Sequence, residues 1–326
     1  MRSEQSTLET KLNVVTEGNQ TVNLDFPGVP GRVSAKLLHE INDYAVRAYY
    51  EPHRWHLGAS LIGHECSRYL WYTFRWCGRE VGKGKNDEER TNELGRRLRL
   101  FNRGHREEER FIEFLRGVGC EVWTHDESQP RDENGEFPQY RVSSINGHFG
   151  GSIDGVIKFP PRYLIDEPVL GEFKTNGTGA NFTKLKEVGV GVGKTQHFIQ
   201  MSTYGRKLGL RYGAYFNVNK NDDDLHVEVT RLNWQLAEQM EHKAERIILA
   251  TDPPPRMSET PTYFKCVGCA MKSVCHEGAL PERNCRSCAH SMPAENAEWY
   301  CRVHAGNIPR EFVPQGCTSY KAITNA

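Results

Sequence analysis

The chain has 326 residues, enough for one large domain or for a core with a small appendage. Apolar residues make up 37% of the sequence and aromatic residues 10%, which predicts a packed core and excludes a disordered chain. Lys and Arg together number 42, as do Asp and Glu, so a nucleic-acid partner would need a local basic patch.

No apolar run approaches the length of a membrane span, and the first residues lack the apolar segment of a signal peptide. We therefore expect a cytoplasmic protein with no membrane partner, in which thiols stay reduced. Ten cysteines are present, and seven of them lie between Cys266 and Cys317. Such clustering in a cytoplasmic chain favours metal binding over disulfides.

The first half of the chain has the pattern of a polar arm followed by helices. Residues 1–30 are polar and lack periodicity, so we expect a loose arm. Apolar residues at helical spacing follow Ser34 and Ser60, and each serine is a suitable N-cap. A long helical pattern covers 92–118 and ends at Gly119.

The second half alternates short strands and helices. Short strands with turns are predicted over 120–159. Two helices, two strands and a further helix follow, over 180–188, 195–209, 212–220, 225–232 and 234–249. The three prolines at 253–255 are expected to end the core, and the cysteine-rich residues come after them.

Two β-type runs between 149 and 174 carry acidic residues. The first contains Asp154 in GSIDG, and the second contains Glu172 and Lys174 in EFK. Strand alternation puts Glu172 and Lys174 on one face and turns Phe173 toward a core on the other. Carboxylates at the ends of neighbouring strands, with a lysine beside them, suit a hard divalent cation and an activated water.

Two helical features accompany these strands. Gly104 precedes His105 and Glu108 on the long helix, and these last two residues are one helical turn apart. Gln200 and Tyr204 are four residues apart on a later helix and therefore share a face.

Together, in this order, the motifs resemble the PD-(D/E)xK nuclease superfamily and its RecB-like branch with a Gln-x-x-x-Tyr motif, over roughly residues 60–280. The resemblance implies an α/β (α+β) fold, a restriction-endonuclease-like core with a mixed central β-sheet flanked by helices. It implies Mg²⁺ or Mn²⁺ held by Asp154, Glu172 and the backbone carbonyl of Phe173.

Further roles follow from the same resemblance. Lys174 is expected to orient the attacking water and help to deprotonate it, and Gln200 and Tyr204 to position the substrate. The third metal ligand, on the helix, is Glu108 by its spacing from the glycine, with His105 as the alternative.

Basic residues suggest where DNA could lie. Lys184, Lys186 and Lys194 fall in a segment, 181–195, that is expected to be flexible and close to the active site. The segment VGVGVGKT ends like a phosphate-binding loop, but Val188 stands where that motif needs glycine, so no nucleotide cofactor is expected. Arginines 96, 97, 99, 103 and 106 either contact phosphates or form a solvated helix face.

Cys266, Cys269 and Cys275 form a C-x2-C-x5-C set that lacks a fourth ligand. Nucleases of the AddB type, and the CRISPR-adaptation nucleases related to them, take it from an upstream helix, and Cys66 has that place in this sequence. The resemblance therefore implies a [4Fe–4S] cluster that closes the core.

Spacing alone also leaves zinc open. One zinc pattern is C-x2-C-x15-C-x2-C over Cys266, Cys269, Cys285 and Cys288. If the iron–sulfur set is separate, a closed zinc site is expected from Cys285, Cys288, Cys301 and Cys317, with His304 or His290 as substitutes. Cys77 and Cys120 are expected to be buried structural thiols.

The sequence thus predicts a RecB-like nuclease core over 31–280 and a zinc-binding tail over 281–326. We expect a Mg²⁺- or Mn²⁺-dependent deoxyribonuclease, an exonuclease acting on DNA ends or single strands in phage-type recombination. A recombination or replication protein is a candidate partner. A CRISPR-adaptation nuclease is the second interpretation, and a non-catalytic DNA-binding or assembly protein that keeps the fold is the third.

Overall fold

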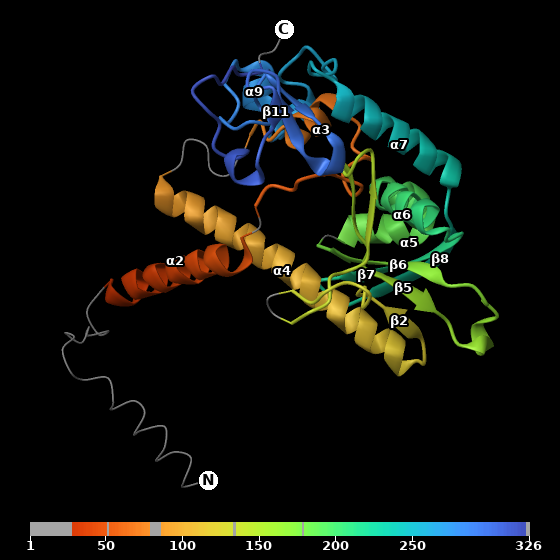
Figure 1. Ribbon diagram of the computed structural model, residues 1–326. Helices are drawn as coiled ribbons and strands as arrows, with labels where there is room; N and C mark the ends of the chain where they lie inside the picture. Colours follow the sequence, from red (N-terminus) through yellow and green to blue (C-terminus); the bar gives the residue numbers. More distant parts are fainter. Residues whose placement is uncertain (1–27, 51, 79–85, 133–134, 178, 324–326) are drawn as a thin grey trace. The chain divides into compact units, whose positions relative to one another are not determined.

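The computed structural model describes residues 28–50, 52–78, 86–132, 135–177 and 179–323 (Figure 1). The polar arm predicted over 1–30 lies outside these residues except for its last positions, 28–30. The chain divides into two compact units. One comprises Met1–Tyr50 and Gly82–Arg99, and the other comprises Glu51–Val81 and Leu100–Ala326.

The described part of the first unit contains helix α2 (Val29–Tyr49) and the beginning of helix α4 (Asp87–Gly117). Gly28, with a φ of 81°, precedes α2, and a proline lies in its first turn. Proline has a helical φ already and no N–H to satisfy, so it favours this early start. The expectation that Ser34 caps the helix is therefore wrong.

The helix predicted to follow Ser60 begins later, as α3 (Ser67–Phe74). Its N-cap is Cys66, whose Sγ accepts a hydrogen bond from the backbone N–H of Tyr69 at 3.4 Å. The residues before it contain strand β1 (Leu57–Gly58), which pairs with a distant strand. This long-range pairing holds the chain extended near Ser60, where residue type alone favoured a helix cap.

The long helix was predicted more accurately. α4 begins one residue after Asn86, whose Oδ1 accepts the backbone N–H of Glu89 at 2.8 Å. The helix ends before Gly119, which has a φ of 83°, as expected for a glycine after a C-terminus.

The second unit contains a five-stranded mixed sheet in the order β2-β5-β6-β7-β8. Its strands are Glu121–Trp123, Gly155–Lys158, Val169–Asn176, Tyr212–Asn219 and Leu225–Arg231. β6 and β7 are parallel, and the other neighbours are antiparallel. Helices α5 (Gly179–Gly193) and α6 (Thr195–Leu208) connect the parallel pair, which needs a crossover.

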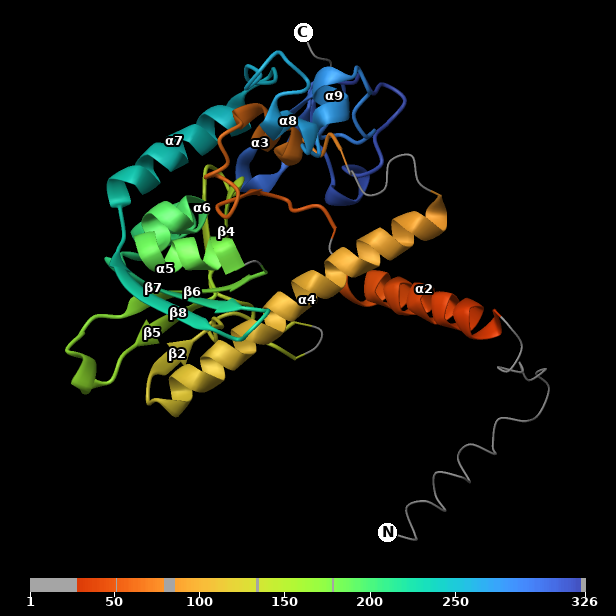
Figure 2. The ribbon, with the colours of Figure 1, turned by 180° about the vertical axis from the view of Figure 1, so that it is seen from behind.

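Helices cover both faces of this sheet (Figures 1 and 2). On one face, the ring of Phe173 lies 5.4 Å from that of Phe111 of α4 and 5.5 Å from that of Phe216 of β7, between centroids. The other face carries α5 and α6, and α7 (Trp234–Leu249) packs on α6. Phe173 therefore lies in a core on the face opposite to Glu172 and Lys174, as predicted.

Smaller elements complete the second unit. One sheet pairs β1 with β4 (Phe149–Ser152) and β4 with β3 (Arg141–Ser144). The residues beyond the prolines at 253–255 belong to the same compact unit. They form helices α8 (Phe264–Val267) and α9 (Lys272–His276) and strands β9 (Ser291–Pro293), β10 (Trp299–Cys301) and β11 (Gly306–Asn307).

The fold is thus α/β, with a mixed central sheet flanked by helices and a small cysteine-rich C-terminal region. Within the described ranges, no helix combines the length and the apolar character needed to cross a bilayer.

Candidate active site

Asp154 stands where the chain passes from β4 to β5, beside the middle of β6. Its Oδ2 accepts the backbone N–H of Phe173 at 2.8 Å, which holds the carboxylate against β6. The Lys174 ammonium lies 3.1 Å from the same oxygen and 2.5 Å from Oε1 of Glu172. The structure therefore brings Asp154, Glu172 and Lys174 together.

The Lys174 ammonium marks a position at which three oxygens hold a positive charge. Besides the two carboxylate oxygens, it donates to the backbone carbonyl of Phe173 at 2.9 Å. Asp154, Glu172 and this carbonyl are the oxygen donors expected for a divalent cation, and hard cations prefer such ligands. The donor set fits Mg²⁺ or Mn²⁺ chemically, but no described group of three or more His, Cys, Asp or Glu side chains is arranged to hold an ion as it stands.

Glu172 is the most deeply buried of the three charged residues brought together here. It is fully buried, and Oε2 has no hydrogen-bond partner among the described residues. Burial raises the pKa of Glu172 to about 8, and the charge of Asp154 adds to this, although Lys174 opposes it. A buried carboxylate whose second oxygen has no partner is a group that would gain from a second positive charge.

Lys174 stays charged despite its surroundings. Burial lowers its pKa, but the carboxylates of Asp154 and Glu172 outweigh this and raise it overall. The side chains of Lys174 and Asp154 keep 24% and 15% of their surface exposed, against 1% for Glu172. Solvent therefore reaches the site from the side of Asp154 and Lys174.

Of the two helix candidates, Glu108 interacts with the other acidic residues. Burial, followed by the charge of Asp154, raises the pKa of Glu108 to about 7. His105, one turn earlier on α4, is exposed. The electrostatic contact with Asp154 thus favours Glu108 as the helix residue of the site.

Gln200 and Tyr204 both lie buried on α6, and the electrostatics of Tyr204 link it to the acidic residues of the site. Burial, followed by the charges of Glu172 and Asp154, raises the pKa of Tyr204. The Tyr204 hydroxyl also lies against the backbone at Gly151, where a Cβ atom would come within 2.4 Å of it. Gly151 thus makes room for this residue two positions before the loop that carries Asp154.

Replacing Gly151 by alanine is expected to lower stability by about 1–3 kcal/mol, because the added methyl group collides with the Tyr204 hydroxyl. Tyr204→Phe removes that hydroxyl and leaves the nearest ring carbon 3.4 Å away, an ordinary contact. The double variant should therefore recover most of the loss. Thermal unfolding of the four proteins measures this coupling, and purely additive losses would contradict the contact.

No family model and no curated protein sequence matches this chain. Among solved structures, SSO0001 superposes with a TM-score of 0.36 and 13% identity, over 76% of this chain and 97% of that one. The alkaline exonuclease LHK-Exo in complex with dAMP gives a TM-score of 0.37 and 13% identity, over 64% of this chain and 89% of that one.

A second structure of LHK-Exo, from Laribacter hongkongensis, gives a TM-score of 0.35 and 13% identity, over 62% of this chain and 90% of that one. At TM-scores this low the likeness is descriptive and carries no weight for function. The function proposed below therefore rests on the side chains of this chain.

Three polar residues beside the site were not predicted from the sequence. Nδ1 of His197 lies 2.8 Å from the hydroxyl of Tyr215, and Asn217 donates to the same hydroxyl at 2.8 Å. Tyr215 and Asn217 are the neighbours of Glu172 and Lys174 across the parallel pair β6–β7. The one signal in the sequence was the position of His197, three residues before Gln200 on the same helix.

The lysine-bearing segment 181–195 is helical over most of its length. Its helix α5 has a break at Gly189, where φ is 70°, and Oε2 of Glu228 accepts the following backbone N–H, of Val190, at 2.7 Å. Lys184 is exposed, and Lys186 pairs with Asp224. The basic groups that remain open to a ligand are therefore fewer than the sequence suggests.

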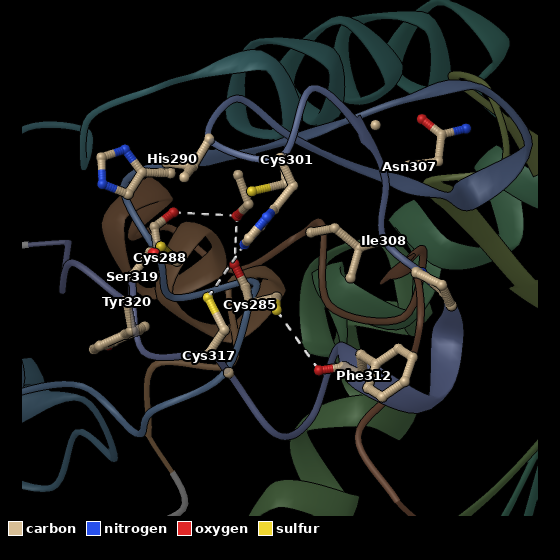
Figure 3. Close-up of a pocket in the computed structure, with 16 residues that line it drawn as sticks. Cys285, Cys288, His290, Cys301, Asn307, Ile308, Phe312, Cys317, Ser319 and Tyr320 are labelled. Carbon is tan, nitrogen blue, oxygen red and sulfur yellow. Dashed lines mark hydrogen bonds between the residues drawn. The ribbon is translucent and has the colours of Figure 1, made fainter.

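The cysteines are all free thiols, and two sets of four each line a separate pocket. Cys66, Cys266, Cys269 and Cys275 line one of them. Cys285, Cys288, Cys301 and Cys317 line another, of about 290 Å³, together with His290 and His304 (Figure 3). The alternative zinc pattern, which takes two cysteines from each set, is thus divided between two pockets.

In neither pocket are three or more of these thiols arranged to hold a metal ion as they stand. In the larger one, Sγ of Cys285 contacts the carbonyl of Phe312 at 3.6 Å, and Sγ of Cys317 contacts Nε2 of His304 at 3.8 Å (Figure 3). Cys77 and Cys120 are buried, as predicted.

Binding of a divalent cation at the carboxylates is expected to release protons between about pH 6 and 8. Glu108 and Glu172 are partly protonated there, because their pKa values are about 7 and 8, and a cation competes with those protons. The affinity of the site for the divalent cation should therefore rise with pH across this range. Calorimetry with Mn²⁺ in buffers of different ionisation enthalpy measures the release, and a heat independent of the buffer would contradict the site.

Proposed function

We propose that this chain is a metal-dependent DNA nuclease that hydrolyses phosphodiester bonds. The observation that carries the proposal is the Lys174 ammonium held by oxygens of Asp154, Glu172 and Phe173. The same oxygens are of the type that Mg²⁺ and Mn²⁺ prefer, and Glu172 is a buried carboxylate whose Oε2 has no partner among the described residues.

In this proposal, Asp154, Glu172 and the Phe173 carbonyl hold the cation, and Glu108 is the helix ligand in preference to His105. A bound divalent cation supplies positive charge for the phosphate and acidifies a water. The cation would take the place that the Lys174 ammonium now holds, and Lys174, whose side chain is partly exposed, would orient the attacking water beside it. Gln200 and Tyr204 position the substrate from α6.

The preferred substrate within this proposal is linear DNA, cut from its ends or as single strands, as in phage-type recombination. Exposed basic residues on the second unit, Lys184, Arg103 and Arg106, are candidates for phosphate contacts. CRISPR adaptation is the second biological setting.

Purified protein, handled anaerobically, should cut end-labelled linear DNA with Mg²⁺ or Mn²⁺ and lose this activity in Asp154→Ala. Linear and circular substrates, both single- and double-stranded, distinguish an exonuclease from an endonuclease. Failure to cut any of them with either ion would overturn the proposal and leave a non-catalytic DNA-binding or assembly protein.

We also propose a [4Fe–4S] cluster at Cys66, Cys266, Cys269 and Cys275. Four thiols around one pocket are the donor chemistry that this cluster uses. It would join the cap of α3 to α8 and α9, segments far apart in the sequence, and so act as a structural staple.

The second set supports a zinc ion at Cys285, Cys288, Cys301 and Cys317. These thiols come from separate segments of the C-terminal region and share one pocket, which suits a closed structural site. His304 is the alternative to Cys317, which it contacts.

Metal analysis after anaerobic purification tests both proposals. We expect a brown protein with about four iron ions and about one zinc ion per chain. Cys66→Ser should lose the colour and keep the zinc, and Cys301→Ser should do the reverse. A colourless protein with two zinc ions per chain would contradict the cluster and indicate zinc at both sets of cysteines.

A further inference from the structure

His197, Tyr215 and Asn217 form a hydrogen-bonded chain that the roles above do not use. The Tyr215 hydroxyl accepts from Nδ2 of Asn217 at 2.8 Å and lies 2.8 Å from Nδ1 of His197. Tyr215 and Asn217 are fully buried, and their partners in register on β6 are Glu172 and Lys174. The chain therefore runs beside both reactive residues.

The orientation of the Asn217 amide selects the tautomer of His197. Because Asn217 donates to Tyr215, the buried phenol proton needs an acceptor, and Nδ1 of His197 is within reach. A neutral ring whose Nδ1 accepts carries its own proton on Nε2. Burial, followed by the charges of Lys174 and Lys194, lowers the pKa of His197 to about 3, so the ring is neutral near pH 7.

The Nε2 atom of His197 is free to meet a ligand. It has no hydrogen-bond partner among the described residues, and it is not one of the unpartnered atoms sealed from solvent. His197 also shares a face of α6 with Gln200 and Tyr204, three and seven residues further on. An unused N–H donor thus lies with the residues expected to position the substrate.

We propose that His197 is a substrate-binding residue whose Nε2–H donates a hydrogen bond to a phosphate oxygen of the DNA backbone at the active site. Tyr215 and Asn217 are positioning residues that hold the ring in this tautomer. A phosphate oxygen is the acceptor that fits, because the charges that act on the His197 ring, those of Lys174 and Lys194, are both positive. The inference rests on the proposed nuclease function and adds a substrate contact to that site.

Two substitutions of His197 distinguish the role of Nδ1 from that of Nε2. His197→Asn keeps a polar group near Nδ1 for Tyr215 but removes the donor at Nε2. His197→Gln places an amide N–H near Nε2 and keeps the side chain neutral. His242→Asn, at an exposed histidine of α7, is the matched control.

The measurement is the affinity for short end-labelled DNA in Ca²⁺, by fluorescence anisotropy, together with KM and kcat in Mg²⁺, on the full chain purified anaerobically. His197→Asn should weaken binding and raise KM about tenfold, with a smaller change in kcat, because the contact is already present in the bound substrate. His197→Gln should recover most of the loss, and His242→Asn should lose nothing. Circular dichroism of each variant checks the fold.

The tautomer is measured directly by long-range ¹H–¹⁵N correlation spectra of the histidine rings. We expect the pattern of an Nε2–H tautomer for His197, and a mixture of tautomers with weaker DNA binding in Tyr215→Phe. An Nδ1–H tautomer in the parent protein would overturn the inference.

The remaining outcomes are also decisive. Equal damage in His197→Asn and His197→Gln, or none in His197→Asn while the parent cuts DNA, overturns the donor role and leaves the nuclease function standing. A parent protein that neither binds nor cuts DNA overturns both proposals together.

Discussion

Glu172→Gln should abolish DNA cleavage, by at least about 10³-fold, and at the same time make the metal-free protein more stable at pH 9. Glutamine has the shape of glutamate but no charge, so it loses a donor for the cation. It also removes a buried carboxylate whose Oε2 has no partner among the described residues. We expect a gain of roughly 1–3 kcal/mol in the free energy of unfolding at pH 9.

The gain should depend on pH in a defined direction. Burial raises the pKa of Glu172 from its ordinary value of 4.5 to about 8 in the folded protein. Below about pH 4.5 the residue is neutral in both the folded and unfolded states, so the substitution changes little. Between about pH 4.5 and 8 the unfolded parent has lost this proton while the folded parent still holds it, so the stability of the parent falls across this window and levels off above pH 8, while that of the variant does not change.

Thermal unfolding with EDTA at pH 5 and pH 9 measures the difference. Glu113→Gln, at an exposed glutamate on α4, is the control and should change neither activity nor this pH dependence. Added Mn²⁺ should reverse the order at pH 9, because it stabilises the parent alone. A variant that is less stable than the parent at pH 9 without metal would show that the pair with Lys174 outweighs the cost of burial.

This site illustrates what the sequence allowed us to predict. Glu172 and Lys174 lie on one strand, where alternation assigns them a face, and Asp154 lies close in sequence, in the loop that enters the neighbouring strand. Gln200 and Tyr204 share a helix face for a similarly local reason. The role of Tyr215 and Asn217 depends on the register of β7 beside β6, which joins residues more than 40 positions apart. No local pattern contains that register.

The fold shows the same difference between features set by the local sequence and features set by long-range pairing. The strands of the central sheet and helices α4, α6 and α7 have clear periodicity and lie where predicted. The two wrong helix starts have different causes. α2 starts early because Gly28 and a proline permit it, and α3 starts late because β1 pairs with β4 across the intervening chain. Ser34 and Ser60 are both residue types that suit an N-cap. The early start of α2 can be explained from neighbouring residues, whereas the late start of α3 depends on a long-range strand pairing.

A fully buried arginine joins the cysteine-rich region to the rest of the second unit. The guanidinium of Arg286 lies 4.5, 4.4 and 4.6 Å from the ring centroids of Phe74, Trp76 and Trp299. Its Nη1 donates to the carbonyls of Arg54 and Trp55, both at 3.3 Å. Nε and Nη2 have no partner among the described residues, so much of its contribution must come from packing on the three rings.

Arg286 stands between Cys285 and Cys288, two of the proposed zinc ligands, so its packing fixes their backbone against α3. The neighbouring Arg75 donates to the carbonyls of Arg286 and Ser291, at 3.3 and 3.0 Å, and strengthens the same junction. Burial, followed by the charge of Arg75, lowers the pKa of Arg286 well below its usual range. Loss of this side chain should therefore loosen the C-terminal region as a whole.

Arg286→Ala is expected to lower the free energy of unfolding by about 3–5 kcal/mol, because it leaves a large cavity among the three aromatic rings. Arg286→Met should cost less than half as much, since methionine fills the space and has no unpartnered polar atoms. Anaerobic urea unfolding followed by tryptophan fluorescence compares the two, with the exposed Arg302→Ala as the control, expected within about 0.5 kcal/mol of the parent. If Arg286→Met were as damaging as Arg286→Ala, the hydrogen bonds to Arg54 and Trp55, and not the packing, would hold the C-terminal region in place.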